Sequence, residues 1–317
     1  MKNIYSNIYK NSLKNLNIAI KILKKNNIIV VPTETVYGIA GNAYSQSAVK
    51  KIYKLKNRPK KNPLIIHYRD ISSVKKDAKI NDRFIKLYKK FSPGPITFIL
   101  EKKKKSKICK LANAKLNTIA VRFPKHNSIR NLLKKIDFPL AIPSANIAGK
   151  ISPVSPDDVI DEFGKKISFI LDGGRSQVGL ESTVVNLFGK TKILRPGAIT
   201  KKHLKEVLRE RLTTFKGSKK IRSPGLLKKH YSPGIPIKLN SKKGNNKVAF
   251  ITFGKKYKNG KNIFNLSSKG NLNEAGKNLY KILRKIKNSQ FKSINVAKIP
   301  NKGIGVAIND RLRRAAK

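Results

Sequence analysis

The chain has 317 residues, 39% of them hydrophobic, which is enough for two domains that each bury a core. Its 13 Phe and 10 Tyr exclude a disordered chain, despite a formal net charge of +56. No apolar run approaches the roughly 20 residues that a membrane span needs, and the single Cys109 excludes internal disulfides and multi-thiolate metal sites. We therefore expect a cytoplasmic globular protein without a signal peptide.

The positive charge has two interpretations. Of the 72 basic residues, 14 are Arg and 58 are Lys, and the lysines occur in every segment. A field of this size would bind polyanions with a strong salt dependence. The same spread, without basic blocks interleaved with aromatic residues, is also typical of a biased proteome composition. The charge alone does not identify the function.

Apolar periodicity predicts alternating helices and strands along the first two thirds of the chain. Helices are expected at 13–28, 45–57, 81–91, 127–136, 156–163 and 200–211. Strands are expected in the segments NIIVV, PLIIHY, TFILEK, TIAVRFP, PLAI, ISFIL, STVVNLF and TKILRPG. The last two strands are joined by Gly-Lys, and such a hairpin favours a mixed α/β sheet over a strictly parallel one.

The chain divides into three parts. Residues 1–213 form the first domain, and residues 214–240 form a linker with two SPG turns that also contains His230 and Tyr231. Residues 241–317 form a smaller α/β domain with strands VAFITF, NIFNLSS and INVAKIP, a helix at 272–287 and the final helix GIGVAINDRLRRAA. Its GIG start is a weak nucleotide-binding signal, and we interpret it as packing.

Four loops rich in hydroxyl and amide side chains stand out, and we expect each at the end of an apolar strand, where open α/β sheets bind ligands. They are PTETVYG (32–38), KNRPKKNPLIIH (56–67), AIPSANIAGKISP (141–153) and GLESTVVN (179–186). Any one of them could equally serve to cap helices and make turns. Convergence of all four would indicate a site for phosphate, carboxylate or carbonyl oxygens.

Three arginines also lie in strand-end positions of this lysine-rich chain, namely Arg58, Arg122 and Arg195. Arginine offers a planar fork that matches phosphate or carboxylate, whereas lysine is a compact point charge. Together, Lys56 and Arg58 could hold a polyphosphate. Each arginine, taken alone, could equally well form an exposed ion pair instead of binding phosphate or carboxylate.

The combination of PTETVYG, the KxR pair Lys56–Arg58, NPLIIH, the SxN pair Ser144–Asn146 and ESTVV resembles the YrdC/Sua5 family. These proteins are threonylcarbamoyl-AMP synthases of tRNA modification. HYSPGIP in the linker and the last helix resemble the long, two-domain Sua5 form. The resemblance implies a YrdC-like mixed twisted sheet with flanking helices, plus a smaller C-terminal Rossmann-like α/β domain, with the linker closing over the active site.

The resemblance also implies a nucleotidyltransferase reaction. L-threonine, bicarbonate or CO2, and ATP would give threonylcarbamoyl-AMP, pyrophosphate and water. Mg2+ would accompany ATP, and no carboxylate cluster indicates a metal site made by the protein alone. A downstream tRNA threonylcarbamoyl transferase would then modify tRNAs that read ANN codons, giving the nucleoside t6A.

Site residues follow from the matched motifs. The threonine pocket would contain Thr35, His67, Arg122, Ile142 and Ser182. ATP would contact Arg58, Asn62, Thr118, Ser144, Ser152, Arg195 and Tyr231. The set expected to act at the phosphates is Lys56, Arg58, Ser144 and Asn146. Glu34 and Glu181 are expected to have structural roles, and Tyr231 to close over the nucleotide.

Two other functions stay open at this point. An RNA-binding or ribosome-maturation factor would use the basic surface on double-stranded RNA, and weak tRNA binding is also compatible with the synthase. A carbamoyl-phosphate-dependent enzyme is the other alternative, but such proteins add zinc fingers that Cys109 alone cannot supply. The role of the C-terminal domain is not indicated by any motif.

Overall fold

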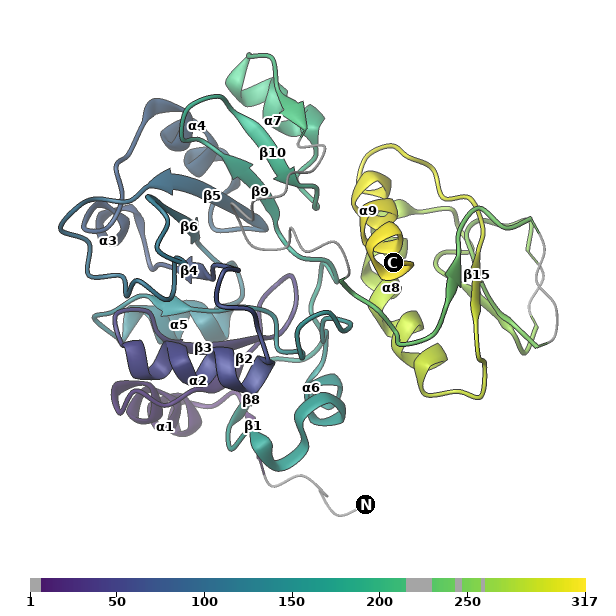
Figure 1. Cartoon of the computed structure of the whole chain (residues 1–317), viewed down its shortest axis with the longest axis horizontal. Helices are drawn as coiled ribbons and strands as arrows, with labels where there is room; N and C mark the ends of the chain where they lie inside the picture. The colour runs from purple at the N-terminus through teal and green to yellow at the C-terminus, as the bar shows by residue number, and fades with distance from the viewer. Residues whose placement is uncertain (1–6, 215–229, 243–246, 258–259) are drawn as a thin grey trace.

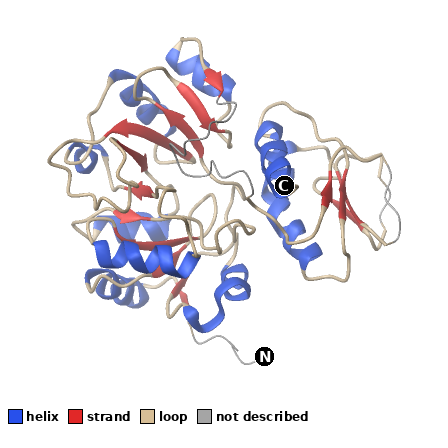
Figure 2. Cartoon of the chain, in the orientation of Figure 1, coloured by secondary structure: helices blue, strands red, loops and turns tan. Residues whose placement is uncertain are grey.

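The computed structural model describes residues 7–214, 230–242, 247–257 and 260–317. They form two bodies side by side, and the helices of the smaller body face the larger one (Figure 1). Figure 2 shows that each body combines helices and strands, so the α/β prediction is confirmed. No helix in the described ranges is long and apolar enough to cross a membrane.

The larger body is built on a mixed sheet. Its strands are β1 (Ile8–Lys10), β2 (Ile29–Val31), β3 (Gly38–Asn42), β4 (Ile65–His67), β5 (Ile96–Glu101), β6 (Thr118–Arg122), β7 (Leu140–Ala141), β8 (Ile170–Asp172), β9 (Thr183–Asn186), β10 (Lys192–Arg195) and β11 (Thr213–Thr214). Their order across the sheet is β1-β8-β2-β3-β7-β4-β6-β5-β9-β10-β11. The β9–β10 pair is antiparallel and the β4–β6 pair is parallel, which confirms the predicted hairpin and the mixed sheet.

The helices of the larger body are α1 (Leu13–Lys24), α2 (Gln46–Lys56), α3 (Ile71–Lys75), α4 (Asp82–Phe91), α5 (Asn127–Lys134), α6 (Pro156–Phe163) and α7 (Lys201–Leu208). Capping side chains begin several of them: Ser12, Ser45 and Ser155 each accept a backbone N–H from the first turn. All six predicted helices are present. The first one ends earlier than residue 28, because Asn26 has a left-handed φ of 55°.

The smaller body has the predicted strands and helices. Its strands β12 (Ile237–Lys238), β13 (Ala249–Thr252), β14 (Ile263–Asn265) and β15 (Ile294–Val296) are all parallel, in the order β12-β15-β13-β14. Helices α8 (Leu272–Lys287) and α9 (Gly305–Ala315) cover the face toward the larger body (Figure 1). The structure thus places the last residues of the predicted 214–240 linker in the second sheet, while residues 215–229 lie outside the described residues.

Two of the four motif loops do not follow a strand, contrary to the sequence prediction. Residues 32–38 follow β2 and residues 141–153 follow β7, as expected. Residues 56–67 instead begin at the end of α2 and lead into β4, and residues 179–186 lead into β9. The mixed sheet explains how such a loop still reaches the same region, because β9 runs antiparallel to β10 and so begins beside its end.

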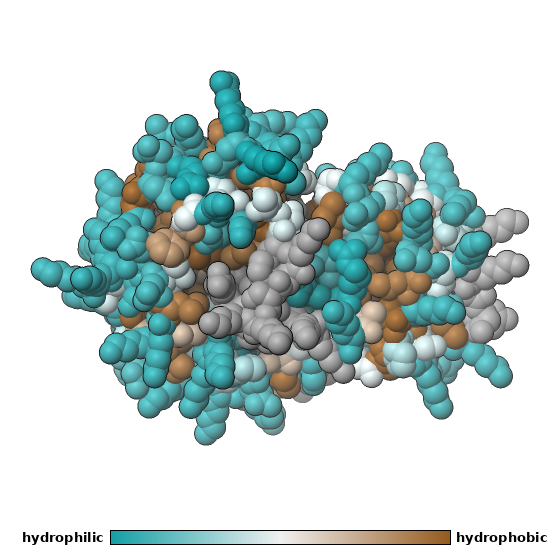
Figure 3. Space-filling view, turned by 45° about the horizontal axis from the view of Figure 1, so that its top comes forward, coloured by the Kyte–Doolittle hydropathy of each residue, from teal (hydrophilic) through white to brown (hydrophobic). Residues whose placement is uncertain are grey.

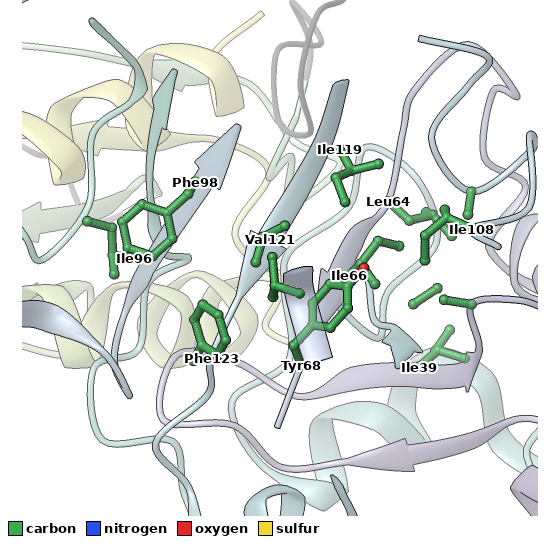
Figure 4. Close-up of a cluster of buried hydrophobic side chains, with 14 of the residues drawn as sticks. Ile39, Leu64, Ile66, Tyr68, Ile96, Phe98, Ile108, Ile119, Val121 and Phe123 are labelled. Carbon is green, nitrogen blue, oxygen red and sulfur yellow. The ribbon is translucent and has the colours of Figure 1, made fainter. Parts of the chain in front are cut away.

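Apolar side chains fill both bodies, whereas hydrophilic side chains dominate the face in Figure 3. Figure 4 shows part of the larger core, in which Phe98, Val121 and Phe123 lie close together. A second cluster joins α8 and α9 to residues of the larger body, including Val36 and Leu180. The two bodies therefore share a continuous apolar contact.

Replacement of Phe84 tests the larger core. The Phe84 ring is fully buried and lies edge-on to Phe98, with 5.0 Å between centroids. We expect Phe84→Ala to lower the free energy of unfolding by about 3–5 kcal/mol through lost burial and a residual cavity. Leu13, which is 74% exposed, is the matched control, and Leu13→Ala should change that free energy by less than about 0.5 kcal/mol. Urea denaturation followed by circular dichroism measures both, and equal losses would contradict this assignment of the core.

Candidate active site

A cavity lies between the motif loops of the larger body and the described end of the linker. The predicted site residues that line it are Thr35, Arg58, His67, Arg122, Ile142, Ser144, Arg195 and Tyr231. Gly38 permits a close approach of two loops at its wall. A Cβ there would lie 2.3 Å from Cγ2 of Ile142 and 2.9 Å from the carbonyl oxygen of Pro143. Glycine is therefore required where the 32–38 and 141–153 loops meet.

A buried ion pair forms one end of the cavity. Nη2 of Arg122 donates to Oε1 of Glu34 and to Oγ1 of Thr35, both at 2.7 Å. The other carboxylate oxygen of Glu34 accepts the backbone N–H of Lys125 at 3.0 Å. Nε of Arg122 is buried without a hydrogen-bond partner. Glu34 therefore fixes the guanidinium, as its predicted structural role requires, and leaves part of the fork available for an anion.

His67 lies beside Arg122, because the two residues are partners in the β4–β6 register. Its Nδ1 is 3.2 Å from the carbonyl oxygen of Ile65, so Nδ1 carries the proton and donates it. Burial, together with the charge of Arg122, lowers the pKa of His67 well below its usual value. The ring is therefore neutral at physiological pH, and its buried, unpartnered Nε2 is a hydrogen-bond acceptor.

Lys56 joins two of the motif loops. It ends α2, is 1% exposed, and donates from Nζ to the carbonyl oxygens of Ser144 and Asn146. The side-chain amide of Asn146 donates to Ile147 and Lys150, while its Oδ1 is buried without a partner. Burial lowers the pKa of Lys56 well below its usual value, and the charge of Arg58 lowers it further. The KxR and SxN motifs are thus one connected unit.

Arg58 is held by the loop that follows it. Its Nε donates to the carbonyl oxygen of Asn62 at 3.0 Å, and its Nη2 donates to that of Pro63 at 2.8 Å. Burial lowers the pKa of Arg58 to about 10, so the group remains charged at neutral pH. Both side-chain amide atoms of Asn62 are buried without a partner. This geometry orients the guanidinium through two carbonyls, which a lysine could not reproduce.

Arg195, the last residue of β10, binds the loop before β9. Its Nε donates to the carbonyl oxygen of Ser182 at 3.0 Å, and its Nη2 lies 3.1 Å from the Ser182 hydroxyl. That hydroxyl is also 2.7 Å from Oγ1 of Thr97. Ser182 therefore contacts the cavity wall through Arg195 but does not itself line the cavity.

The described end of the linker closes another side of the cavity. Tyr231 is fully buried with a left-handed φ of 66°, and its hydroxyl has no hydrogen-bond partner. The ring of His230 lies 4.0 Å from the Tyr231 ring, and burial lowers the pKa of His230 to about 3. The N–H of Ser232 donates to the carbonyl oxygen of Gly149 at 2.9 Å, which fastens this segment to the 141–153 loop.

The remaining predicted residues lie around the cavity and not on its lining. Ser152 donates to Oε1 of Glu181 at 2.5 Å, and Glu181 does line the cavity. Thr118 begins β6, at the opposite end of that strand from Arg122, and does not line the cavity. Four further predicted residues are connected to the cavity by a hydrogen bond to a lining residue or to the loop that carries one. They are Lys56, Asn62, Asn146 and Ser182. Glu181 and His230 also line the cavity; both lie inside the matched motifs ESTVV and HYSPGIP, but neither was predicted to bind a ligand.

Buried polar atoms without partners concentrate at this cavity. Those at or beside the cavity are atoms of Asn62, His67, Arg122, Asn146, His230 and Tyr231, and the others in the described residues belong to Ser92, Asn113, Ser128, Glu210, Thr252 and Arg284. Each buried unpaired group costs about 1–3 kcal/mol, so the fold tolerates them where a ligand can satisfy them. At one end of the cavity, the Arg122 guanidinium lies beside the Thr35 hydroxyl and the neutral His67 ring. The cationic residues Arg58, Arg195 and Lys56 lie in or beside the rest of the cavity. It suits a small carboxylate together with a polyanion.

The described residues contain no group of three or more His, Cys, Asp and Glu side chains able to hold a metal ion. The two carboxylates at the cavity or its rim, those of Glu34 and Glu181, already have hydrogen-bond partners in the protein. Glu34 binds Arg122, and Glu181 accepts from Ser152 and from the second body. The protein carboxylates here are therefore counter-charges to arginine.

Comparisons with known proteins agree with this architecture. Residues 21–197 match the family model Sua5_yciO_yrdC, described as Telomere recombination, and residues 199–317 match the model described as Threonylcarbamoyl-AMP synthase, C-terminal domain. The chain is 33% identical to the threonylcarbamoyl-AMP synthase of Pyrococcus abyssi over 95% of this chain and 94% of that one. It is 39% identical to the Bacillus subtilis protein of that name over 60% of this chain and 55% of the other.

A solved structure extends the similarity to three dimensions. The crystal structure of P. abyssi Sua5 complexed with L-threonine superimposes with a TM-score of 0.87 and 30% identity, covering 98% of this chain and 97% of that one. Both bodies are included in this match. The chain therefore belongs to the Sua5/YrdC family, in its two-domain Sua5 form.

Proposed function

We propose that this protein is a threonylcarbamoyl-AMP synthase, which condenses L-threonine, bicarbonate or CO2, and ATP to threonylcarbamoyl-AMP and pyrophosphate, with water as a further product when bicarbonate is the substrate. One observation carries the proposal: a single cavity joins the Arg122–Thr35–His67 group to the Arg58–Arg195 group. The nearly full-length similarity to an enzyme of this name supports it. The first group offers a carboxylate-binding fork beside a neutral imidazole for an amino acid, and the second offers arginines for the phosphates of a nucleotide.

In this proposal, L-threonine binds at the end formed by Arg122, Thr35 and His67. The free part of the Arg122 fork takes the carboxylate, since charge-assisted hydrogen bonds of this type are worth about 1.5–3 kcal/mol. The threonine hydroxyl donates to Nε2 of His67, the unpartnered acceptor beside Arg122. A pocket with such an acceptor rejects analogues without a hydroxyl better than an apolar pocket does. Ile142 supplies apolar contact, and Ser182 supports the opposite wall.

ATP occupies the part of the cavity that contains Arg58, Ser144, Arg195 and Tyr231. Contact of ATP with Asn62, Thr118 and Ser152, which lie outside the lining, stays a prediction from the motifs. The deprotonated threonine amine captures CO2 as a carbamate. A carbamate oxygen then attacks the α-phosphorus, and pyrophosphate leaves in line. Transfer of this kind needs positioning and charge neutralisation more than a protein nucleophile. Arg58 and the Lys56–Asn146 unit are placed to supply both.

Mg2+ enters this proposal as part of the nucleotide substrate. Mg2+ retains several waters and binds chiefly through substrate phosphates when the protein offers few carboxylates. The two carboxylates beside the cavity are bound to arginine or hydroxyl groups. These residues fit a nucleotide that brings its own metal ion, which neutralises phosphate charge.

The linker serves as a cover in the same proposal. Tyr231 separates the cavity from α8 and α9, and its free hydroxyl is available to the nucleotide. Exclusion of water protects the mixed anhydride of the product from hydrolysis. Because residues 215–229 of the linker lie outside the described residues, point substitutions in the described part test this role better than a deletion.

The product needs an acceptor, which leads to the proposed partners. A mixed anhydride of a carbamate and AMP is an activated carbamoyl donor, and a tRNA threonylcarbamoyl transferase would use it to form t6A. The net charge of +56 supports weak, salt-sensitive contact with tRNA or double-stranded RNA. A cytoplasmic location fits both the substrate tRNA and a chain with one cysteine.

Arg58→Lys is the first test of the activity. Lysine keeps the charge but cannot donate to both carbonyls and a phosphate, so threonine-dependent pyrophosphate release should fall about 10- to 150-fold, the loss of one charged hydrogen bond. Release is measured from ATP and Mg2+ with and without L-threonine and bicarbonate. Arg69→Lys is the matched control, because Arg69 is exposed and pairs with Asp70 at the surface; it should retain wild-type activity.

Three outcomes separate the possibilities. Wild-type release that needs both threonine and bicarbonate supports the synthase. Release that survives Arg58→Lys unchanged keeps the enzyme but removes the role assigned to the Arg58 fork. Absence of threonine-dependent release from folded wild-type protein overturns the synthase and favours the RNA-binding alternative.

A pair of substitutions at His67 tests the hydroxyl acceptor. Gln retains an acceptor oxygen and Leu does not, so we expect His67→Leu to raise KM for threonine about 10-fold or more and His67→Gln to raise it less. Because the pKa of His67 is lowered well below 6.5, wild-type activity should show no titration of this group near pH 6.5. Its neutral form is lost only at more acidic pH. Equal KM values for the two variants would contradict the acceptor role.

A further inference from the structure

The second body contributes an arginine to the rim of the cavity in the first. Arg311 of α9 is fully buried, and its Nε donates to Oε2 of Glu181 at 2.8 Å. Tyr280 of α8 donates its hydroxyl proton to the same carboxylate, with O–O distances of 2.8 and 3.0 Å. Ser152 donates to Oε1 of Glu181 at 2.5 Å. Two residues from one body and one from the other therefore hold a single carboxylate.

The same arginine supports the linker. The Arg311 guanidinium carbon lies 5.2 Å from the centre of the Tyr231 ring, within the range of a cation–π contact. Tyr280 stacks on Tyr231 from the second body, with 5.7 Å between centroids and 25° between planes. Tyr231 therefore has an aromatic ring and a guanidinium behind it, while its hydroxyl stays unpartnered.

A third contact reaches the strand that ends in Arg195. Nη2 of Arg311 donates to the carbonyl oxygen of Pro196 at 3.0 Å, and Nη1 binds Asp310 at 2.8 Å. The planar fork thus touches Glu181, the Pro196 carbonyl and the Tyr231 ring at once. Only arginine combines three directed donors with a flat face that packs on a ring.

We propose that Arg311 is a positioning residue of the nucleotide half of the active site, supplied by the C-terminal domain and acting through Glu181, Pro196 and Tyr231. The proposal rests on the proposed function, because it concerns the same cavity. It assigns to the C-terminal domain a part in forming the site. Arg311 does not touch the threonine half, which consists of Thr35, His67 and Arg122.

Two physical arguments favour positioning over stability. Buried ion pairs contribute little net stability, because desolvation offsets the attraction between the charges. The geometry is also directional: Ser152 donates its one hydroxyl proton to Glu181, so the position of Glu181 on the cavity wall fixes the orientation of this hydroxyl. Although burial raises the pKa of Glu181, the charges of Arg311 and Arg195 bring it to about 2, so the carboxylate that accepts this proton stays ionised.

The test compares ligand affinities in Arg311→Met, Arg311→Lys and Tyr280→Phe. Arg313→Met is the matched control, because Arg313 is an exposed residue of the same helix. Titration calorimetry gives separate dissociation constants for ATP with Mg2+ and for L-threonine, and pyrophosphate release gives KM and kcat. Thermal unfolding of each variant shows whether it is folded.

The expected result is selective. Both Arg311 variants should raise the dissociation constant and KM for ATP by about 10-fold or more, while the threonine dissociation constant stays within about 2-fold of wild type. Tyr280→Phe keeps the ring and loses one hydrogen bond to Glu181, so its effect on ATP should be smaller. Arg313→Met should bind both ligands as wild type does.

Two results would overturn the proposal. One is wild-type ATP affinity in all folded variants. The other is a parallel loss of ATP and threonine affinity that follows the fall in unfolding temperature, which indicates a purely structural role. Where Arg311→Met does not fold, because Glu181 is left without its cation, Arg311→Lys and Tyr280→Phe decide. Wild-type protein that binds ATP but makes no product would contradict the proposed function and leave the positioning result intact.

Discussion

Buried positive charge around one cavity is the constraint on which the rest of this structure depends. Lys56, Arg122 and Arg195 are each at most 4% exposed, and Arg58 lies among them. Cations out of water repel one another strongly, and they require hydrogen-bond acceptors and counter-charges. Backbone carbonyls of the motif loops and two carboxylates, Glu34 and Glu181, supply these. The contacts that hold the motif loops in place are therefore the same contacts that assemble the site.

This constraint also explains how the two bodies are joined. Glu181 belongs to the larger body, but its counter-charge Arg311 belongs to the smaller one. A second buried arginine of the smaller body also binds the larger one: Nη2 of Arg284 in α8 donates to the carbonyl oxygen of Ile151 at 2.7 Å. The first joint includes Glu181 of the cavity wall, and the second lies next to Ser152, which donates to Glu181. A rearrangement between the bodies would therefore change the positions of Ser152 and Tyr231.

The sequence predicted the architecture well and the chemistry only in part. Helix periodicity was sufficient for α2, α4 and α8, because each has a long apolar stripe with a capping residue before it. Five short elements were missed, because two to five residues are too few for periodicity to show: strands β1, β3, β11 and β12 and helix α3. The partners of Glu34 and Glu181 could not be predicted, since pairing with Arg122 and Arg311 joins positions about 90 and 130 residues apart.

The lysine-rich composition makes the placement of arginine informative. The buried arginines of the described chain, Arg122, Arg195, Arg284 and Arg311, all lie at the cavity or between the two bodies. Arg122, Arg195 and Arg311 each donate to more than one group, which requires the rigid fork, whereas Arg284 donates to Ile151 and lies 3.8 Å from the carboxylates of Asp158 and Glu162. Among the described residues Lys56 is the one buried lysine, and its single Nζ donates to the carbonyl oxygens of both Ser144 and Asn146. Geometry therefore determines which cation occupies each interior position.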